Sequence, residues 1–371
     1  MPVAAAKALS VDADPALTIE RVTARAVLAP LAQPIRTAAG HIPKAPLVLI
    51  DVHASGGIVG RSYIFAYTPL ALRPLVQFIG ELGAALSGKA AAPACLMDEF
   101  NRRFRLVGWQ GLIGMAVSGL DMAFWDALAR ARNEPLVRLL GGEPRALPAY
   151  DSFGLVDVKA DLPLLARSVE SGFCAIKIKI GDGDLAHDVA VVGAVRDAIG
   201  PGIALMVDFN QSLDPVEARR RIARLAAFDL HWVEEPVEHE DLHGHARVRQ
   251  TSPVPIQTGE NWWFWRDMEK AIAAGASDYA MLDAMKIGGV TGWMRAAALA
   301  QAASLPVSSH IFTEVSAHLL AVTPTAHWLE HLDVASAILA EPQVAERGTM
   351  TARGPGFGLE WDEHAIAHYA A

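Results

Sequence analysis

The chain has 371 residues, 52% hydrophobic and 20% charged, which is enough for a barrel-sized domain with a smaller domain beside it. Its formal net charge of -9 argues against nucleic acid and anionic membrane surfaces as partners. Two cysteines far apart in sequence imply no disulfide framework, and we expect neither a signal peptide nor a membrane span. These features predict a soluble, cytoplasmic protein of the size of an enzyme.

Residues 1–144 are expected to form a first domain of α+β type. Segments 17–28, 46–53 and 58–65 are rich in Val, Ile and Leu, which predicts three strands. From Pro69 to about Arg132 the apolar residues recur at helical spacing instead. A block of strands followed by a block of helices is typical of an α+β domain.

Residues 145–340 alternate between short apolar strands and helices. The eight predicted strands are 147–152, 175–180, 204–208, 231–235, 255–260, 279–283, 306–310 and 326–330. Asp214 and Pro215 mark the start of the helix that follows the third strand. This alternation predicts a (β/α)8-type barrel, a modified TIM barrel with one unit altered. The tail, residues 341–371, is expected to return to the first domain.

Three acidic residues end successive predicted strands, one βα unit apart: Asp208, Glu234 and Glu260. In a barrel such residues meet at the C-terminal face, where active sites lie. Oxygen ligands suit a hard cation, and Mg²⁺ fits best because it needs few carboxylates. The alternative is that each carboxylate pairs with a barrel lysine or arginine. This alternative accounts well for a single carboxylate but less well for three carboxylates at equivalent strand ends.

Lys177 and Lys179 are two residues apart on the second predicted strand, so both point into the barrel while Ile176, Ile178 and Ile180 face the helices. Two buried ammonium groups disfavour each other's charged form, and a nearby Mg²⁺ adds to this effect. We therefore expect a lowered lysine pKa, as a general base at neutral pH requires. The alternative is that the lysines bridge the acidic cluster.

Asp283 and His310 end the neighbouring sixth and seventh strands, an arrangement in which a carboxylate orients an imidazole base. Glu330 ends the eighth strand. Beside a substrate carboxylate we expect it to be protonated, so that it can donate a hydrogen bond to developing enolate charge.

These residues lie within longer stretches with a distinctive pattern. They include Lys177-Ile-Lys179, Met206-Val-Asp-Phe-Asn-Gln-Ser-Leu213, Trp232-Val-Glu-Glu-Pro236, Thr258-Gly-Glu-Asn-Trp262, Asp283-Ala-Met-Lys-Ile-Gly-Gly289, Ser308-Ser-His-Ile-Phe312 and, in the N-terminal half, Gly119-Leu-Asp-Met-Ala-Phe-Trp-Asp126. From about residue 20 to its end, the chain resembles the mandelate racemase/muconate lactonizing family of the enolase superfamily. The resemblance implies a barrel with an N-terminal capping domain that the tail completes.

The same resemblance implies roles for individual residues. Asp208, Glu234 and Glu260 would bind Mg²⁺. Lys179 and His310, the latter oriented by Asp283, would be bases on opposite faces of the substrate carbon. Lys177 would hold the substrate carboxylate, and Glu330 would support the enolate as an acid. The implied substrate contacts are Asn210, Ser152, Ile35, Thr37, Ala39, Ile42, Tyr67, Ile311 and Leu332.

The expected activity is racemisation of a 2-hydroxy carboxylate, mandelate or a related aryl 2-hydroxy acid, by a homo-oligomer. An acid-sugar dehydratase of the same superfamily is the alternative, but a polyol needs many polar lid residues, and the implied lid is mostly apolar. Arg36 and His41 are its polar exceptions, and Ala39 is smaller than the expected valine. A non-catalytic binding barrel is disfavoured because no catalytic position is missing.

Overall fold

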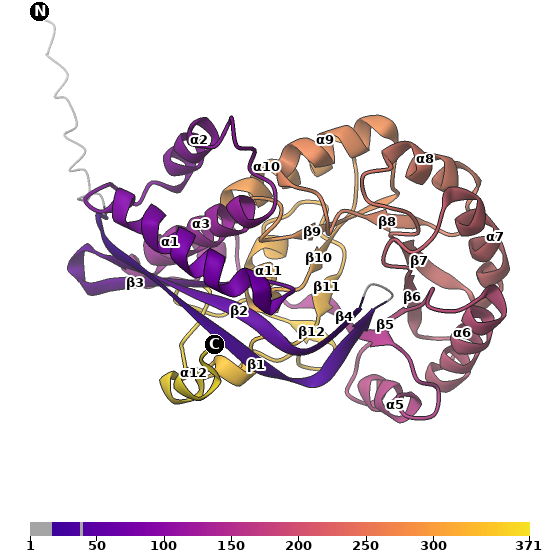
Figure 1. Cartoon of the computed structure of the whole chain (residues 1–371). Coiled ribbons are helices and arrows are strands. Elements are labelled where there is room, and N and C mark those ends of the chain that lie inside the picture. Colours follow the sequence, from indigo (N-terminus) through magenta and orange to yellow (C-terminus); the bar gives the residue numbers. More distant parts are fainter. Residues whose placement is uncertain (1–16, 38–39) are drawn as a thin grey trace, which may run out of the picture.

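A computed structural model describes residues 17–37 and 40–371, which form a capping domain and a barrel (Figure 1). The capping sheet is antiparallel in the order β1-β2-β3, with strands β1 (Ile19–Thr37), β2 (Gly40–Ala54) and β3 (Ile58–Phe65). Its helices are α1 (Leu72–Leu86), α2 (Pro93–Arg103), α3 (Leu112–Ala131) and α4 (Leu136–Leu139). The predicted order of strands before helices is confirmed.

Helix α3 forms the centre of the capping domain. Gly119 lets it approach the sheet closely, since a Cβ there would lie 2.6 Å from Ile50 Cδ1. In the described part of the chain, α3 is the one helix long and apolar enough to cross a membrane, but 78% of its apolar window is buried inside the protein. Packing in the domain core therefore accounts for its apolar character.

The barrel is a parallel sheet in the order β10-β9-β8-β7-β6-β5-β4-β11. Its strands are β4 (Leu147–Leu155), β5 (Ala175–Lys179), β6 (Ala204–Asp208), β7 (Leu230–Glu234), β8 (Ile256–Thr258), β9 (Tyr279–Asp283), β10 (Val307–His310) and β11 (Leu329–His331). A parallel bridge from Val307 to Ala326 joins β10 to the segment before β11 and so closes the barrel.

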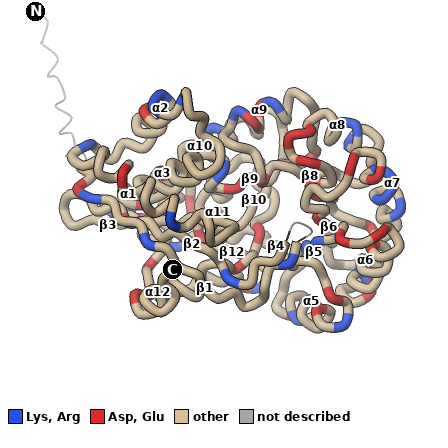
Figure 2. Tube along the Cα trace, viewed as in Figure 1, with Lys and Arg blue, Asp and Glu red and all other residues tan. Residues whose placement is uncertain are grey.

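Helices surround the barrel, one after each of its first seven strands (Figure 1). They are α5 (Leu162–Glu170), α6 (Leu185–Ile199), α7 (Pro215–Leu225), α8 (Leu242–Thr251), α9 (Phe264–Ala274), α10 (Gly289–Ala302) and α11 (Thr313–Ala321). A short 3₁₀ turn, Ser336–Ile338, follows β11, so the eighth helix is the altered unit. Both acidic and basic residues lie on the outer helices α5 to α9 (Figure 2).

The capping strands are longer than predicted. Strand β1 continues past Leu28 and strand β2 begins before Pro46, and these extensions form what we call the hairpin arm, residues 31–37 and 40–43, which reaches over the barrel. The register shifts between Pro30 and Ile35, after which Ile35 pairs with Ile42 and Arg36 with His41. Prolines interrupt the apolar pattern there, so local sequence rules end the strand too early.

The tail contacts both domains. Strand β12 (Thr349–Met350) pairs with β4 of the barrel, and helix α12 (Glu363–Tyr369) lies near β1. Trp361 Nε1 donates to Asp51 Oδ1 of the capping sheet at 2.7 Å. The domain limits 1–144, 145–340 and 341–371 stay a prediction.

Candidate active site

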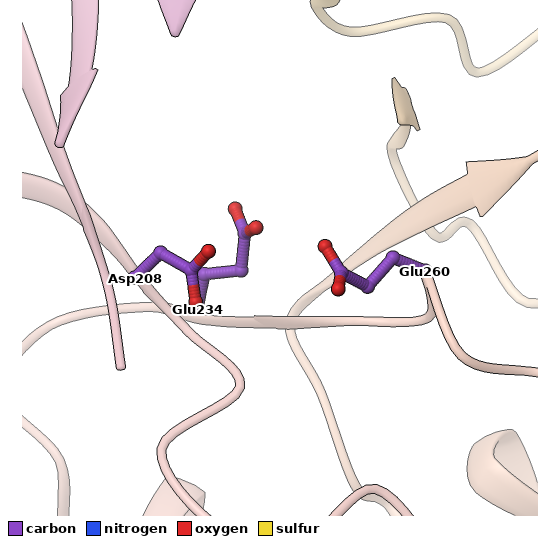
Figure 3. Close-up of side chains that lie close together, drawn as sticks. All are labelled: Asp208, Glu234 and Glu260. Atoms are coloured by element: carbon purple, nitrogen blue, oxygen red, sulfur yellow. The ribbon is translucent and has the colours of Figure 1, made fainter. Parts of the chain in front are cut away.

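Three buried carboxylates meet at the C-terminal end of the barrel (Figure 3). Asp208 ends β6 and pairs in register with Glu234 at the end of β7, while Glu260 lies two residues beyond β8. One oxygen of each lies within 4.8 Å of the others. Gly259 allows this turn, since it has a φ of 133° and a Cβ there would lie 2.6 Å from Met281 O.

The hydrogen bonds of these carboxylates leave room for a cation. Asp208 Oδ1 accepts the Asn210 N–H at 2.6 Å, and Glu234 Oε2 accepts from Trp232 Nε1 at 3.2 Å. Glu260 Oε2 is buried and accepts no hydrogen bond, and its one nearby cationic partner among the described residues is His310 Nε2, 3.3 Å away, which is charged only when the imidazole is protonated. A buried carboxylate oxygen is costly without a positive partner, so this donor set suits a metal ion.

The inward direction of both lysines is confirmed. Lys177 Nζ lies 2.6 Å from Glu234 Oε1 and 2.9 Å from Glu330 Oε1, while Lys179 Nζ pairs with Asp208 Oδ2. Burial lowers the pKa of Lys179, but the carboxylates of Asp208, Glu260 and Glu234 together outweigh burial, so its pKa is raised. The pKa of Lys177 is raised in the same way, by Glu234 and Glu330. The expected lowering of the lysine pKa is therefore wrong when only the protein's own groups act on the lysines, because the carboxylates outweigh the second lysine.

The lysines neutralise only part of the acidic cluster. The buried carboxylates at the ends of β6 to β9 and β11 are Asp208, Glu234, Glu235, Glu260, Asp283 and Glu330, and the buried lysines among them are Lys177, Lys179 and Lys286. Within the described residues, Glu260 forms no ion pair with a lysine. The excess negative charge favours a divalent cation, and Mg²⁺ is the cofactor that these residues fit.

His310 and Asp283 form the predicted pair. They lie opposite each other on β10 and β9, with His310 Nδ1 2.8 Å from Asp283 Oδ2. Asp283 Oδ1 accepts the backbone N–H groups of Met285 and Lys286 at 2.8 and 2.9 Å, which holds the carboxylate in place. Burial lowers the pKa of His310, but Glu260 and Asp283 outweigh burial and raise it.

Glu330 is ionised in the protein. Burial raises its pKa, but Lys177, His310 and the Ile311 N–H together outweigh burial and lower the pKa to about 2. Its Oε2 also accepts the Ile311 N–H at 2.8 Å, a bond that stabilises the anion. In the protein by itself Lys177 supplies the counter-charge, and protonation of Glu330 beside a substrate carboxylate stays a prediction.

A cavity of about 570 Å³ separates the capping domain from the barrel end. The predicted residues that line it are Lys179, Asn210, Glu260, His310, Glu330, Ile35, Thr37, Ile42, Tyr67, Ile311 and Leu332. Those buried behind this lining are Lys177, Asp208, Glu234 and Asp283. Ser152 pairs with Lys177 in the sheet and lies outside the lining, and Ala39 lies outside the described residues.

Further polar groups line the cavity that sequence reasoning did not assign: Gln211, His239, Asn261 and Lys286. His239 comes from the loop after β7, and its Nδ1 lies 3.0 Å from Gln211 Oε1. Each follows a barrel strand by a few residues, which is the signal that would have found them. The apolar residues Phe65, Met115 and Trp263 complete the wall.

Backbone strain is concentrated at this cavity. Tyr67, Asn210, Gln211 and Ile311 all line it and have positive φ values of 59°, 46°, 66° and 46°. Such conformations are uncommon for residues other than glycine, and they gather at functional sites where the surrounding structure holds them. The strain supports a binding role for the cavity.

Comparison with known proteins gives the family. Residues 19–141 match the mandelate racemase/muconate lactonizing enzyme N-terminal domain, and residues 162–365 match the enolase C-terminal domain-like family. The chain is 34% identical to the L-talarate/galactarate dehydratase of Salmonella typhimurium over 259 residues, covering 68% of this chain and 65% of that enzyme. It is 32% identical to the 3,6-anhydro-α-L-galactonate cycloisomerase of Streptomyces coelicolor over 331 residues, covering 87% and 91%.

A solved structure is more similar still. It is an enolase from Bradyrhizobium complexed with magnesium and mandelic acid, 57% identical, with a TM-score of 0.94 and coverage of 96% of this chain and 99% of that one. An enolase from an alpha proteobacterium with bound magnesium is 42% identical with a TM-score of 0.91, covering 96% and 100%. The protein is therefore a member of the enolase superfamily, with a mandelate racemase/muconate lactonizing enzyme N-terminal domain.

Proposed function

We propose that the protein is a Mg²⁺-dependent racemase of 2-hydroxy carboxylates, with mandelate or a related aryl 2-hydroxy acid as substrate. The observation that carries this proposal is the pair of bases in one cavity, Lys179 on β5 and His310 on β10. Strands β4 and β11 lie between them on one side of the barrel, and β6 to β9 on the other. Two bases on opposite faces of one carbon can remove a proton from either enantiomer and return it to the other side.

Each residue has a role that its contacts support. Bound Mg²⁺ supplies Lewis-acid stabilisation of negative charge on the substrate carboxylate. Lys177, fixed between Glu234 and Glu330, offers a positive charge to the same carboxylate. His310 takes or returns the proton through Nε2, because Asp283 holds the other ring nitrogen. A substrate anion near Glu330 would compete for Lys177 and so favour the protonated acid.

The cavity wall supports an aryl substituent. Ile35, Ile42, Ile311 and Leu332 line it, and burial of a phenyl-sized group against them would contribute about 1.5–3 kcal/mol. Arg36 could have supplied a charge for a sugar acid, but it pairs with Asp161 and is not part of this lining. The mandelic acid bound to the Bradyrhizobium relative is in keeping with this choice.

The alternative is dehydration of an acid sugar. Gln211, His239, Asn261 and Lys286 favour it, because these polar groups could bind substrate hydroxyls. The Salmonella typhimurium relative is named a dehydratase of acid sugars, whereas the Streptomyces coelicolor relative is named a cycloisomerase of a sugar acid. A non-catalytic barrel has least support, since each predicted catalytic position carries a suitable side chain. Assembly into a homo-oligomer and a cytoplasmic location stay predictions.

The two activities are separated by ¹H NMR in D₂O with Mg²⁺. Each enantiomer of mandelate and a panel of aldonates and aldarates are incubated with the enzyme. A racemase exchanges the α-proton of both mandelate enantiomers and removes the optical rotation. Rapid loss of water from an acid sugar, with mandelate optically unchanged, would overturn the racemase proposal and support the dehydratase.

A further inference from the structure

Strand β1 of the hairpin arm presents different side chains to two cavities, while His41 of β2 lines both. Ile35 and Thr37 line the substrate cavity, whereas Arg36, between them, lines a second cavity of about 330 Å³. Successive side chains of a strand point to opposite sides, so this division follows from the extended backbone. The second cavity lies between the arm and the end of β4, and Phe153, Gly154 and Leu155 are part of its wall.

An ion pair joins the arm to the barrel at this point. The Arg36 guanidinium contacts Asp161 Oδ2 at the start of α5. Asp161 Oδ2 also accepts the Asp157 N–H at 2.8 Å, so the barrel loop holds the carboxylate in place. Its side chain is 14% exposed, against 43% for Arg36. In the described part of the chain, no other ion pair connects the arm with the barrel.

The arm backbone also lies directly on β4. A Cβ at Gly154 would lie 2.6 Å from Arg36 O and 2.8 Å from Arg36 N, so only glycine permits the observed approach. Gly154 is not among the residues with positive φ, and its backbone would accept another residue. The requirement for glycine at this position therefore comes from the close contact with Arg36.

We propose that Arg36, Asp161 and Gly154 are positioning residues that fix the arm on the barrel and thereby set where Ile35 and Thr37 meet the substituent of the substrate. The inference rests on the proposed function, in which the arm contacts the substrate. Arg36 holds the arm on the barrel, and its sequence neighbours Ile35 and Thr37 contact the substrate. A change at Arg36 therefore moves both substrate contacts together. None of the three positioning residues touches the reacting atoms.

The test compares Arg36→Ala, Asp161→Asn, their double variant and Gly154→Ala with the wild type. Hydrogen exchange of the peptides over 31–37 and 40–44 is measured without substrate, and kcat and KM are measured with mandelate. Asp161→Asn retains an oxygen for the Asp157 N–H and removes the charge. Arg138→Ala is the matched control, because Arg138 pairs with Glu143 at 3.1 Å in the capping domain and is similarly exposed.

Partly exposed ion pairs have small effects, so we expect each charge variant to exchange about two- to five-fold faster in the arm and to raise KM by a similar factor. The value of kcat should change less, because the arm binds the substituent equally in the ground and transition states. The double variant should match either single variant, since the pair is lost once. Gly154→Ala should speed hydrogen exchange in the arm and raise KM by about ten-fold, because the new Cβ must displace the backbone of Arg36.

Unchanged hydrogen exchange of the arm in all four variants would overturn the proposal that Arg36, Asp161 and Gly154 fix the arm on the barrel. Faster exchange with an unchanged KM would overturn the positioning role, because the arm would then be held without acting on the substrate. Faster arm exchange in a protein that never turns over mandelate would support the anchor and contradict the racemase proposal. The KM comparison would then be made with the acid sugar that the enzyme accepts.

Discussion

Replacing Asp283 by Asn changes the proton on His310 while it keeps the size of the side chain. Asp283 Oδ1 accepts two backbone N–H groups, from Met285 and Lys286, and Oδ2 accepts from His310 Nδ1 at 2.8 Å. An Asn has only one oxygen, and the two backbone donors hold it on their side. Its NH₂ group then faces His310 Nδ1, which must accept, so the proton of the neutral ring moves to Nε2. His310 can no longer act as a base there.

The expected loss of activity follows from the free energy needed to turn over the amide of the Asp283→Asn variant, which would restore the proton to His310 Nδ1. Turning the amide over leaves two buried N–H groups unsatisfied, at about 1–3 kcal/mol each, or about 2–6 kcal/mol together. The upper part of that range corresponds to about a thousand-fold or more, in keeping with the roughly 10⁴-fold loss when the Asp of a Ser-His-Asp triad becomes Asn. We expect exchange through His310 to fall about a thousand-fold and exchange through Lys179 to stay within about ten-fold.

The assay is ¹H NMR of α-proton exchange in D₂O, with each enantiomer of mandelate measured separately. Asp151→Asn is the control, since Asp151 Oδ1 lies 2.9 Å from His331 Nδ1 in a similar pair that does not line the cavity. The control should leave both rates unchanged. Equal slowing of both enantiomers in Asp283→Asn, or no slowing of either, would refute the tautomer reasoning.

Three further predictions concern the metal, the bases and a buried histidine. Exhaustive chelation should abolish turnover and Mg²⁺ should restore it, whereas full activity of the metal-free protein would contradict the metal site. His310→Asn should retain exchange of one enantiomer and Lys179→Ala of the other, and loss of both in each variant would exclude opposite faces. Burial lowers the pKa of His318 to about 4, so its contribution to the unfolding free energy is complete above the unfolded pKa of 6.5 and is lost as the pH falls towards 4. In urea titrations, His318→Gln should reduce the loss of stability between pH 7 and pH 5 by about 2 kcal/mol, and an unchanged loss would contradict this assignment.

Local rules were sufficient for the acidic cluster and the lysine strand. Asp208, Glu234 and Glu260 follow successive strands, and in a parallel barrel every strand ends at the same face, so their meeting depends on topology alone. Lys177 and Lys179 point inward because side chains alternate along a strand. The short apolar strands and the spacing of the helices were enough to predict a barrel in which one helix is altered.

Only the tertiary structure decided which groups from distant segments meet and which charge each carries. Arg36 could have reached the substrate or the barrel, and its contact with Asp161, far away in sequence, assigns it to the barrel. Glu330 is an anion because Lys177 lies 2.9 Å away, although its burial alone favours the acid. Coulomb energy and desolvation depend on distances between side chains in space, and a periodic pattern along one chain does not contain those distances.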